Sequence, residues 1–315
     1  MAKLIEHTEN RLAANLAGIP LRTPLLAMSG IFGTDYAALL PGLPSFGAVI
    51  TKSITLQPRP GNETPRLAEL RTGLLNAIGL QNPGVEAFIA RELPKYAVLE
   101  VPVIASVAGG CAEDYVACAR LLAAQEAVCG IELNVSCPNV KKGVQFGSDA
   151  GMLEHLVAQV RPVVQGKPLI VKLTPNVADI TAPARAAING GADVISLINT
   201  IHGMAIDLER QKPILGNIAG GYSGPGVHPV AVYMVYRCYT ECCRAHNIPI
   251  LGMGGVSTPE DALELLLAGA TCVGIGTALF RDPHVFEIVA KGIDEYLRCH
   301  CETSVHGLIG KAARS

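Results

Sequence analysis

The sequence PILGMGGVSTPEDALELLLAGATCVGIGT, residues 249–277, contains the unit that decides the fold. Its two ends, 249–255 and 272–277, are short apolar runs of the length typical of buried strands. Between them, Thr258 and Pro259 form a helix start signal, and the apolar residues that follow as far as Ala268 recur with helical spacing. The segment therefore predicts a strand, a helix and a second strand, which is the unit of an α/β protein with a parallel sheet.

The same kind of apolar run occurs eight times along the chain, with segments of helical periodicity between the runs. Because these runs are too apolar for either face to meet water, helices should cover them. Eight such units predict a (β/α)8 barrel of the TIM type, and residues 1–315 are predicted to form a single barrel domain. The expected strands are 25–29, 48–53, 101–107, 131–136, 169–174, 194–200, 249–255 and 272–277, and the clearest expected helices are 149–164, 178–189, 228–245, 258–268 and 283–298.

Two of the intervals between expected strands, the second and the sixth, are much longer than the others. They contain residues 58–84 and 203–226, which are too polar and too rich in glycine to be single helices. We expect both to be long loops over the C-terminal face of the barrel, where active-site residues gather. A doubly wound sheet is the competing fold, but it requires a helix directly after a glycine-rich first turn, and residues 28–33 are not followed by one.

The composition bounds the class of protein. Hydrophobic residues make up 50% of the 315 residues, which excludes a disordered chain. The formal net charge is −2, tryptophan is absent and aromatic residues total 4%, so the basic field and stacking surface of a nucleic-acid-binding protein are missing. Apolar runs such as 263–268 are far shorter than the ~20 residues that span a bilayer. Residues 1–19 scatter charges among their apolar positions and lack a secretion signal, so we expect a cytoplasmic protein that acts on a small molecule.

The ten cysteines indicate neither disulfides nor a metal site. Most lie in apolar runs, as Cys118, Cys129 and Cys272 do, where buried reduced thiols are expected. The clusters at 238–243 and 299–301 lack the second pair of ligands that a structural metal requires. We therefore expect no metal.

Polar residues and glycines stand at or just after the C-terminal ends of the expected strands. Because these ends share one face of a barrel, the residues should converge on one cavity, which indicates an enzyme. The glycines after the last two strands offer bare backbone N–H groups beside helix starts, which is a typical phosphate cradle, and the segment Gly224-Pro225-Gly226 could add another amide. The residues concerned are Ser29, Lys52, Asn134, Lys172, Asn199, Gly254, Gly255, Gly276 and Thr277.

Lys52 and Lys172 stand in apolar strands, where an unpaired ammonium group is costly, so each needs an anionic partner. A structural ion pair, a contact with an anionic ligand and a Schiff base with a carbonyl substrate are all compatible with these positions. The last of these keeps a cofactor-free lyase or isomerase of the aldolase type open.

The loop after the fourth strand contains Asn134, Cys137 and Asn139. An asparagine side chain can both donate and accept toward the amide edge of a ring. A free thiol has a pKa of ~8.5, so a nearby cation makes its thiolate a usable base close to neutral pH. Cys137 differs from the other cysteines because it lies in a polar loop on the expected active face.

Taken in order, eight short segments resemble those of class 1 dihydroorotate dehydrogenases, and the match covers about residues 12–297. The glycine pairs alone would suit many phosphate-binding barrels, but the full set is highly specific. The resemblance implies an enzyme that uses flavin mononucleotide (FMN) to oxidise dihydroorotate to orotate in pyrimidine synthesis. The segments are Thr51-Lys52-Ser53, NAIGLQNPG at 76–84, NVSCPN at 134–139, Val171-Lys172-Leu173, Ile198-Asn199-Thr200, SGPG at 223–226, Gly254-Gly255 and Gly276-Thr277.

The resemblance also implies a role for each matched residue. Cys137 is the expected base, which takes the C5 proton while hydride leaves C6 for the flavin, and Lys172 is expected to neutralise charge on the reduced ring. The expected substrate contacts are Lys52, Asn76, Ala77, Ile78, Gly79, Leu80, Asn134, Asn139, Asn199 and Thr200. The expected FMN contacts are Ser29, Lys52, Ser53, Asn134, Lys172, Ile198, Gly226, Gly254, Gly255, Gly276 and Thr277.

The details of the resemblance point to a subgroup. Many relatives carry Asn where this chain has Ser106, which puts the role of Ser106 in flavin binding in question. Cys137 and the short segment before residue 12 are unlike the membrane-bound, quinone-using class, which has a serine base.

Residues 76–79 and 139–147 resemble the NAD-linked subgroup, class 1B. That subgroup implies a homodimer within a heterotetramer, bound to an electron-transfer subunit that carries flavin adenine dinucleotide (FAD) and a [2Fe-2S] cluster. This chain itself has no second nucleotide motif and no cysteine spacing for such a cluster.

Three alternatives stay open at the level of sequence. They are a fumarate-dependent class 1A enzyme, a cofactor-free phosphate-binding lyase or isomerase, and a ligand-binding barrel without catalysis. The presence of FMN in the purified protein would separate both flavin enzymes from the other two classes.

Overall fold

The computed structural model describes residues 10–33, 43–136 and 146–314. Its centre is a closed barrel of eight parallel strands, all of them fully buried, and each expected strand is one of them, so the predicted (β/α)8 barrel is confirmed. Around the barrel the strands are β3 (Leu25–Ala27), β4 (Ala48–Ile50), β7 (Val103–Val107), β8 (Gly130–Asn134), β9 (Leu169–Lys172), β10 (Val194–Leu197), β15 (Ile250–Met253) and β16 (Cys272–Ile275).

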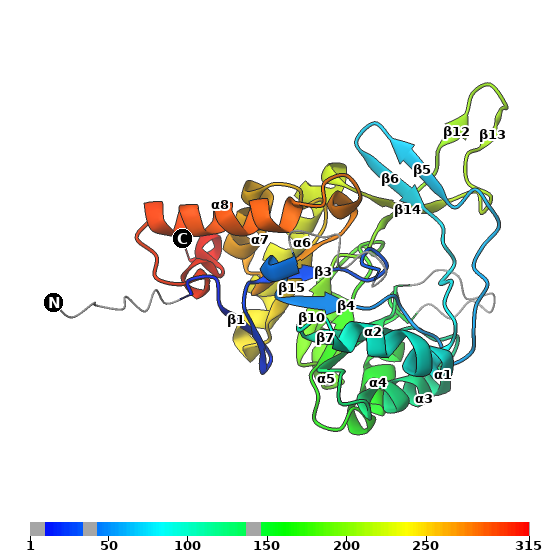
Figure 1. Cartoon of the computed structure of the whole chain (residues 1–315), viewed down its shortest axis with the longest axis horizontal. Helices are drawn as coiled ribbons and strands as arrows, with labels where there is room; N and C mark the ends of the chain where they lie inside the picture. The colour runs from blue at the N-terminus through cyan, green and yellow to red at the C-terminus, as the bar shows by residue number, and fades with distance from the viewer. Residues whose placement is uncertain (1–9, 34–42, 137–145, 315) are drawn as a thin grey trace.

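Helices surround the barrel (Figure 1). α7 begins with a capping box, in which the Thr258 hydroxyl accepts from the Asp261 N–H and the Asp261 carboxylate accepts from the Thr258 N–H. The expected helix 228–245 is shorter than predicted, because the chain widens into a π-helical turn at Tyr239–Cys243. The long helices are α3 (Ala112–Ala123), α4 (Ala150–Val160), α5 (Thr181–Asn189), α6 (His228–Cys238), α7 (Pro259–Ala268) and α8 (Val285–Cys299). None of the described helices is long and apolar enough to cross a membrane.

The two long intervals are only partly loops, so that expectation needs correction. Strands from both intervals pair in one antiparallel sheet, in the order β11 (Ile201–Gly203), β14 (Gly220–Ser223), β6 (Gly73–Asn76) and β5 (Leu67–Leu70). We call this sheet the mouth sheet. The later of the two intervals, which contains 203–226, also forms the hairpin β12 (Ile206–Asp207) and β13 (Lys212–Pro213). The earlier one ends in the short helices α1 (Val85–Ala87) and α2 (Leu93–Ala97), which flank a π-helical turn at Phe88–Glu92. Figure 1 shows the mouth sheet at one end of the molecule, with the hairpin projecting beyond it.

The main core fills the barrel and the layer between the strands and the helices. At the N-terminal end of the strands, the hairpin β1 (Ala14–Leu16) and β2 (Ile19–Leu21) packs Ile19 against Gly130, the first residue of β8. A separate small cluster of Ala68, Leu75, Ala77 and Leu215 lies within the mouth sheet and its flanking segments. The opposite, C-terminal ends of the barrel strands are therefore the end that faces the mouth sheet.

Candidate active site

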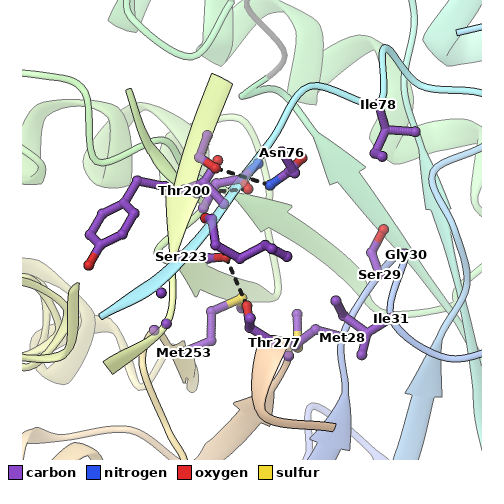
Figure 2. Close-up of a pocket in the computed structure, with 18 of the residues that line it drawn as sticks. Met28, Ser29, Gly30, Ile31, Asn76, Ile78, Thr200, Ser223, Met253 and Thr277 are labelled. Atoms are coloured by element: carbon purple, nitrogen blue, oxygen red, sulfur yellow. Dashed lines mark hydrogen bonds between the residues drawn. The ribbon is translucent and has the colours of Figure 1, made fainter. Parts of the chain in front are cut away.

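One large cavity, about 1160 Å³ in volume, lies between the C-terminal ends of the barrel strands and the mouth sheet. Figure 2 shows part of its wall, with Asn76 and Thr200 near one another and Ser29 on the opposite side. The expected site residues that line it are Ser29, Lys52, Ser53, Asn76, Ala77, Ile78, Gly79, Leu80, Asn134, Lys172, Ile198, Asn199, Thr200, Gly254, Gly255, Gly276 and Thr277. The barrel thus brings together residues that are spread over most of the chain.

Three expected residues are not part of this lining. Gly226 lies behind Tyr222, whose hydroxyl would be 2.3 Å from a Cβ at Gly226, and its N–H donates to the Thr72 carbonyl at 3.3 Å. The expectation that this amide is open to a phosphate is therefore not met in this structure. Cys137 and Asn139 lie outside the described residues.

The glycines after β15 and β16 form one end of the cavity. Gly254 and Gly255 have φ angles of +134° and +74°, and a Cβ at Gly255 would lie 2.7 Å from the Cβ of His228. These two positions therefore require glycine. At Gly276 the nearest atom to an added Cβ is 3.8 Å away, so the space beside it is open cavity. Together the glycines leave backbone unshielded by side chains, as a phosphate cradle requires.

His228, at the start of α6, supports this glycine end and was not singled out from the sequence. Its ring is buried, with Nδ1 2.9 Å from the Gly254 carbonyl oxygen and Nε2 2.9 Å from a carboxylate oxygen of Glu264. The only local signal was a histidine before a proline at a helix start, which is too common to identify a role. The hydroxyl of Thr277 donates to that of Ser223 at 2.8 Å, which joins the glycine end to the mouth sheet (Figure 2).

Barrel side chains form the wall of the cavity nearest β4, β8 and β9. Asn134 and Lys172 are both buried, at 8% and 6% exposure. No carboxylate among the described residues forms an ion pair with the Lys172 ammonium group. A buried cation in that state favours an anionic ligand in the cavity. Lys52 extends across the loop after β3, with Nζ 3.2 Å from where a Gly30 Cβ would be.

The segment after β6 contributes backbone donors to the cavity. The N–H groups of Ile78, Gly79 and Leu80 have no acceptor among the described residues, and all three residues line the cavity. Gly79 and Leu80 both have positive φ angles, +75° and +55°. Successive bare N–H groups in such a turn form a concave anion site, which suits a carboxylate.

The mouth sheet brings the remaining polar groups to the same place. The Asn76 side chain donates to the Gly221 carbonyl at 3.2 Å, which links β6 to β14. A Cβ at Gly221 would lie 2.0 Å from the Thr200 hydroxyl oxygen, so β14 can pass this close to Thr200 only with glycine at position 221. The Asn199 carboxamide oxygen accepts from the Thr200 N–H at 2.9 Å. Asn76, Asn199 and Thr200 therefore form one connected polar wall.

The described cysteines are all free, and most are buried in the core or between helices. Burial raises the pKa of the Cys118 thiol to about 12, and burial also raises the pKa of Cys272. These thiols stay protonated and unreactive at neutral pH. In the described part of the chain, no three metal-binding side chains are grouped in a way that could hold a metal ion.

Comparison with known proteins agrees with this geometry. The family model for "Dihydroorotate dehydrogenase" matches residues 11–297. A protein of Geotalea daltonii named "Dihydroorotate dehydrogenase B (NAD(+)), catalytic subunit" is 46% identical over 305 residues, which cover 95% of this chain and 97% of that protein. Proteins with the same name in Alkaliphilus oremlandii and Desulforudis audaxviator are 45% and 44% identical and cover 96% of this chain, with 99% and 98% of their own lengths matched. The chain belongs to the dihydroorotate dehydrogenase family.

Proposed function

We propose that this chain oxidises dihydroorotate to orotate, a step of pyrimidine biosynthesis, as the catalytic subunit of an NAD-linked, class 1B enzyme. The observation that carries this proposal is that one cavity contains both the glycine end and the bare N–H groups of Ile78–Leu80, with buried Lys172 in its wall. A phosphate-bearing cofactor and a carboxylate-bearing substrate can therefore bind side by side. The chain would act in the cytoplasm as a single barrel domain.

The cavity fits FMN as the cofactor. Gly254, Gly255 and Gly276 present unshielded backbone, and the cavity next to Gly276 is open space that a Cβ would begin to fill. Ser29, Ser53 and Ile198 line the cavity in the positions expected for flavin contacts, and the Lys172 ammonium is expected to offset negative charge. When bound, FMN would supply the hydride acceptor of the reaction.

The chain's own residues would hold the substrate and move its proton. The N–H groups of Ile78, Gly79 and Leu80 together with Lys52 would bind the carboxylate. Asn76, Asn134, Asn199 and Thr200 would bind the ring amides, with Asn139, which lies outside the described residues, as a further contact. Cys137 would act as the general base that takes the C5 proton, because a thiol needs only modest help from a cation to be a usable base close to neutral pH.

The experiment that tests the activity uses the purified protein under anaerobic conditions. Its acid extract should contain FMN, and addition of dihydroorotate should bleach the visible flavin absorbance with formation of orotate. A colourless protein that borohydride inactivates in the presence of a carbonyl ligand would instead support the cofactor-free lyase or isomerase. The ligand-binding alternative predicts neither bleaching nor inactivation.

We infer that electron transfer from this chain to NAD requires a partner subunit. The name "catalytic subunit" implies a partner for the relatives that carry it. We infer a homodimer docked to a subunit with FAD and a [2Fe-2S] cluster. The mouth sheet, the hairpin and their flanking segments expose several large apolar side chains, which are suited to subunit contacts: Leu67, Met204, Ile206, Leu208 and Ile218.

The chain alone should reduce dyes with dihydroorotate, and it should reduce NAD only with that partner. Fumarate-dependent orotate formation by the chain alone would support class 1A instead.

A further inference from the structure

The interior of the barrel contains a carboxylate just below the cavity. Glu132 lies in β8, two residues before Asn134, and is 0% exposed. Its oxygens accept hydrogen bonds from two buried hydroxyls, from Ser106 at 2.9 Å and from Ser196 at 3.5 Å. An acidic side chain in this position is costly, and an apolar residue would fill the same space without that cost.

When Glu132 is ionised and can only accept, the hydrogen bonds between it and the cavity have one possible direction. Ser106 has a single hydroxyl hydrogen, which it donates to Glu132, so toward Ser53, 3.0 Å away, it can only accept. The hydroxyl hydrogen of Ser53 must then point to Ser106. Ser53 is left with acceptor positions alone, and Ser29, 3.3 Å away, can approach it only as a donor. All three hydroxyl hydrogens thus point away from the cavity and toward Glu132.

This direction, together with the Ser136 N–H, sets how the Asn134 side chain is oriented. A carboxamide can present either its oxygen or its nitrogen to a neighbour, and its hydrogen-bond network decides which. Because Ser53 can only accept, the group 2.9 Å from it must be the Asn134 nitrogen. The Asn134 oxygen then accepts from Asn199 Nδ2 and from the Ser136 N–H, each at 3.3 Å. The shortest of these three bonds is the one that leads to Glu132.

We propose that Glu132 is a positioning residue, which acts through Ser106 and Ser53 to hold the Asn134 amide with its second N–H available to the cavity. This inference rests on the proposed function, in which Asn134 binds the ring of the substrate. The orientation selects a ligand that presents a carbonyl oxygen at this point, as the imide edge of a pyrimidine ring does. Glu132 itself does not touch the ligand.

The main test is Ser106→Ala in the FMN-loaded protein. It leaves the Glu132 carboxylate in place but removes the hydroxyl between Glu132 and Ser53, so the Ser53 hydroxyl can turn. The Asn134 nitrogen then loses the fixed acceptor of its shortest hydrogen bond, and only the bonds to its oxygen still hold the amide. We expect the KM for dihydroorotate and the Kd for orotate, measured by calorimetry, to rise about 3- to 10-fold, with kcat changed less than about 2-fold. If the role of Ser106 were purely structural, the variant would have a lower thermal midpoint of unfolding, but KM would not rise while kcat stayed nearly unchanged.

Matched variants separate orientation from stability. Ser196→Ala removes the other hydroxyl bound to Glu132. That hydroxyl does not connect Glu132 to Asn134, so the variant should leave KM and Kd unchanged. Ser106→Asn should restore both, because its amide can donate to Glu132 and accept from Ser53. Ser106→Cys, with similar volume and weak hydrogen bonding, replaces the alanine variant if that one does not fold.

The outcomes are distinct. A rise in KM and Kd for Ser106→Ala, with recovery in Ser106→Asn and none in Ser196→Ala, supports the role of Glu132. Equal effects in Ser106→Ala and Ser196→Ala, or no effect in either, overturn it. A wild-type protein that neither binds orotate nor is reduced by dihydroorotate overturns the proposed function first and this inference with it.

Discussion

The two ends of the cavity are built in different ways. The glycine end comes from the turns after β15 and β16, within residues 254–277, and it offers mainly backbone. The opposite end joins Asn76, Thr200 and Gly221, which the mouth sheet brings together from two distant intervals. The comparison indicates that a common group such as a phosphate can be bound by local backbone geometry. Selection of one particular ring as the substrate requires side chains, and the pairing of strands from distant parts of the chain places those side chains.

Loss of the proposed base, Cys137, should have the largest effect. Cys137→Ala should leave FMN bound but slow flavin reduction by dihydroorotate about 10²- to 10⁴-fold, because a positioned general base is removed. Stopped-flow absorbance under anaerobic conditions measures this rate. Cys137→Ser is the control and should partly recover as pH rises. Wild-type reduction rates in the alanine variant would remove Cys137 from the mechanism.

At the glycine end, a single methyl group should affect the cofactor and spare the chemistry. Gly276→Ala should weaken FMN binding to the apoprotein about 10- to 100-fold, because the methyl group fills cavity space next to the backbone donors that a phosphate uses. Fluorescence quenching gives the affinity. Riboflavin, which lacks the phosphate, is the matched ligand and should bind the variant as it binds the wild type. Equal losses for both ligands would place the phosphate elsewhere.

In the mouth sheet, the expected effect is on the substrate. Gly221→Ala should raise the KM for dihydroorotate about 10-fold, because the new Cβ would displace the Thr200 hydroxyl, only 2.0 Å away. FMN affinity should change little. Gly203→Ala in the neighbouring strand is the control, since its Cβ would meet no atom nearer than 3.3 Å. If both variants behave alike in steady-state kinetics, the mouth sheet does not position Thr200.

The smallest expected effect concerns the helix that follows the glycine end. Burial alone would raise the pKa of Asp261, but the N–H groups of Ser257 and Thr258 donate to its carboxylate at 2.8 Å and hold the pKa below its usual value. A carboxyl whose pKa is lowered by folding stabilises the protein when ionised, so its contribution is present above pH ~4 and is lost as pH falls below that. Asp261→Asn should cost about 0.5–2 kcal/mol of unfolding free energy at pH 7.

Urea unfolding at several pH values measures that difference. The gap between wild type and Asp261→Asn should shrink as pH falls below ~4, where both carry a neutral group. Glu260→Gln is the control, because Glu260 lies in the same helical turn and is exposed, without these hydrogen bonds. A gap that is independent of pH would mean that the charge of Asp261 contributes nothing.

The sequence by itself determined the barrel and most of the cavity wall. Strand length, apolar runs and helix start signals are local, and the ends of parallel strands in a barrel necessarily share one face. Lys172, Asn134 and the glycine pairs could therefore be assigned to one cavity in advance.

The tertiary structure alone decided the mouth sheet, because its strands are short and their partners lie in separate intervals. Leu75 opposite Tyr222 is one example. It also decided the engaged N–H of Gly226 and the direction of the hydrogen bonds from Ser29 to Glu132. A hydrogen bond has a direction only once both partners and their remaining donors are in place, and no pattern along the chain contains that information.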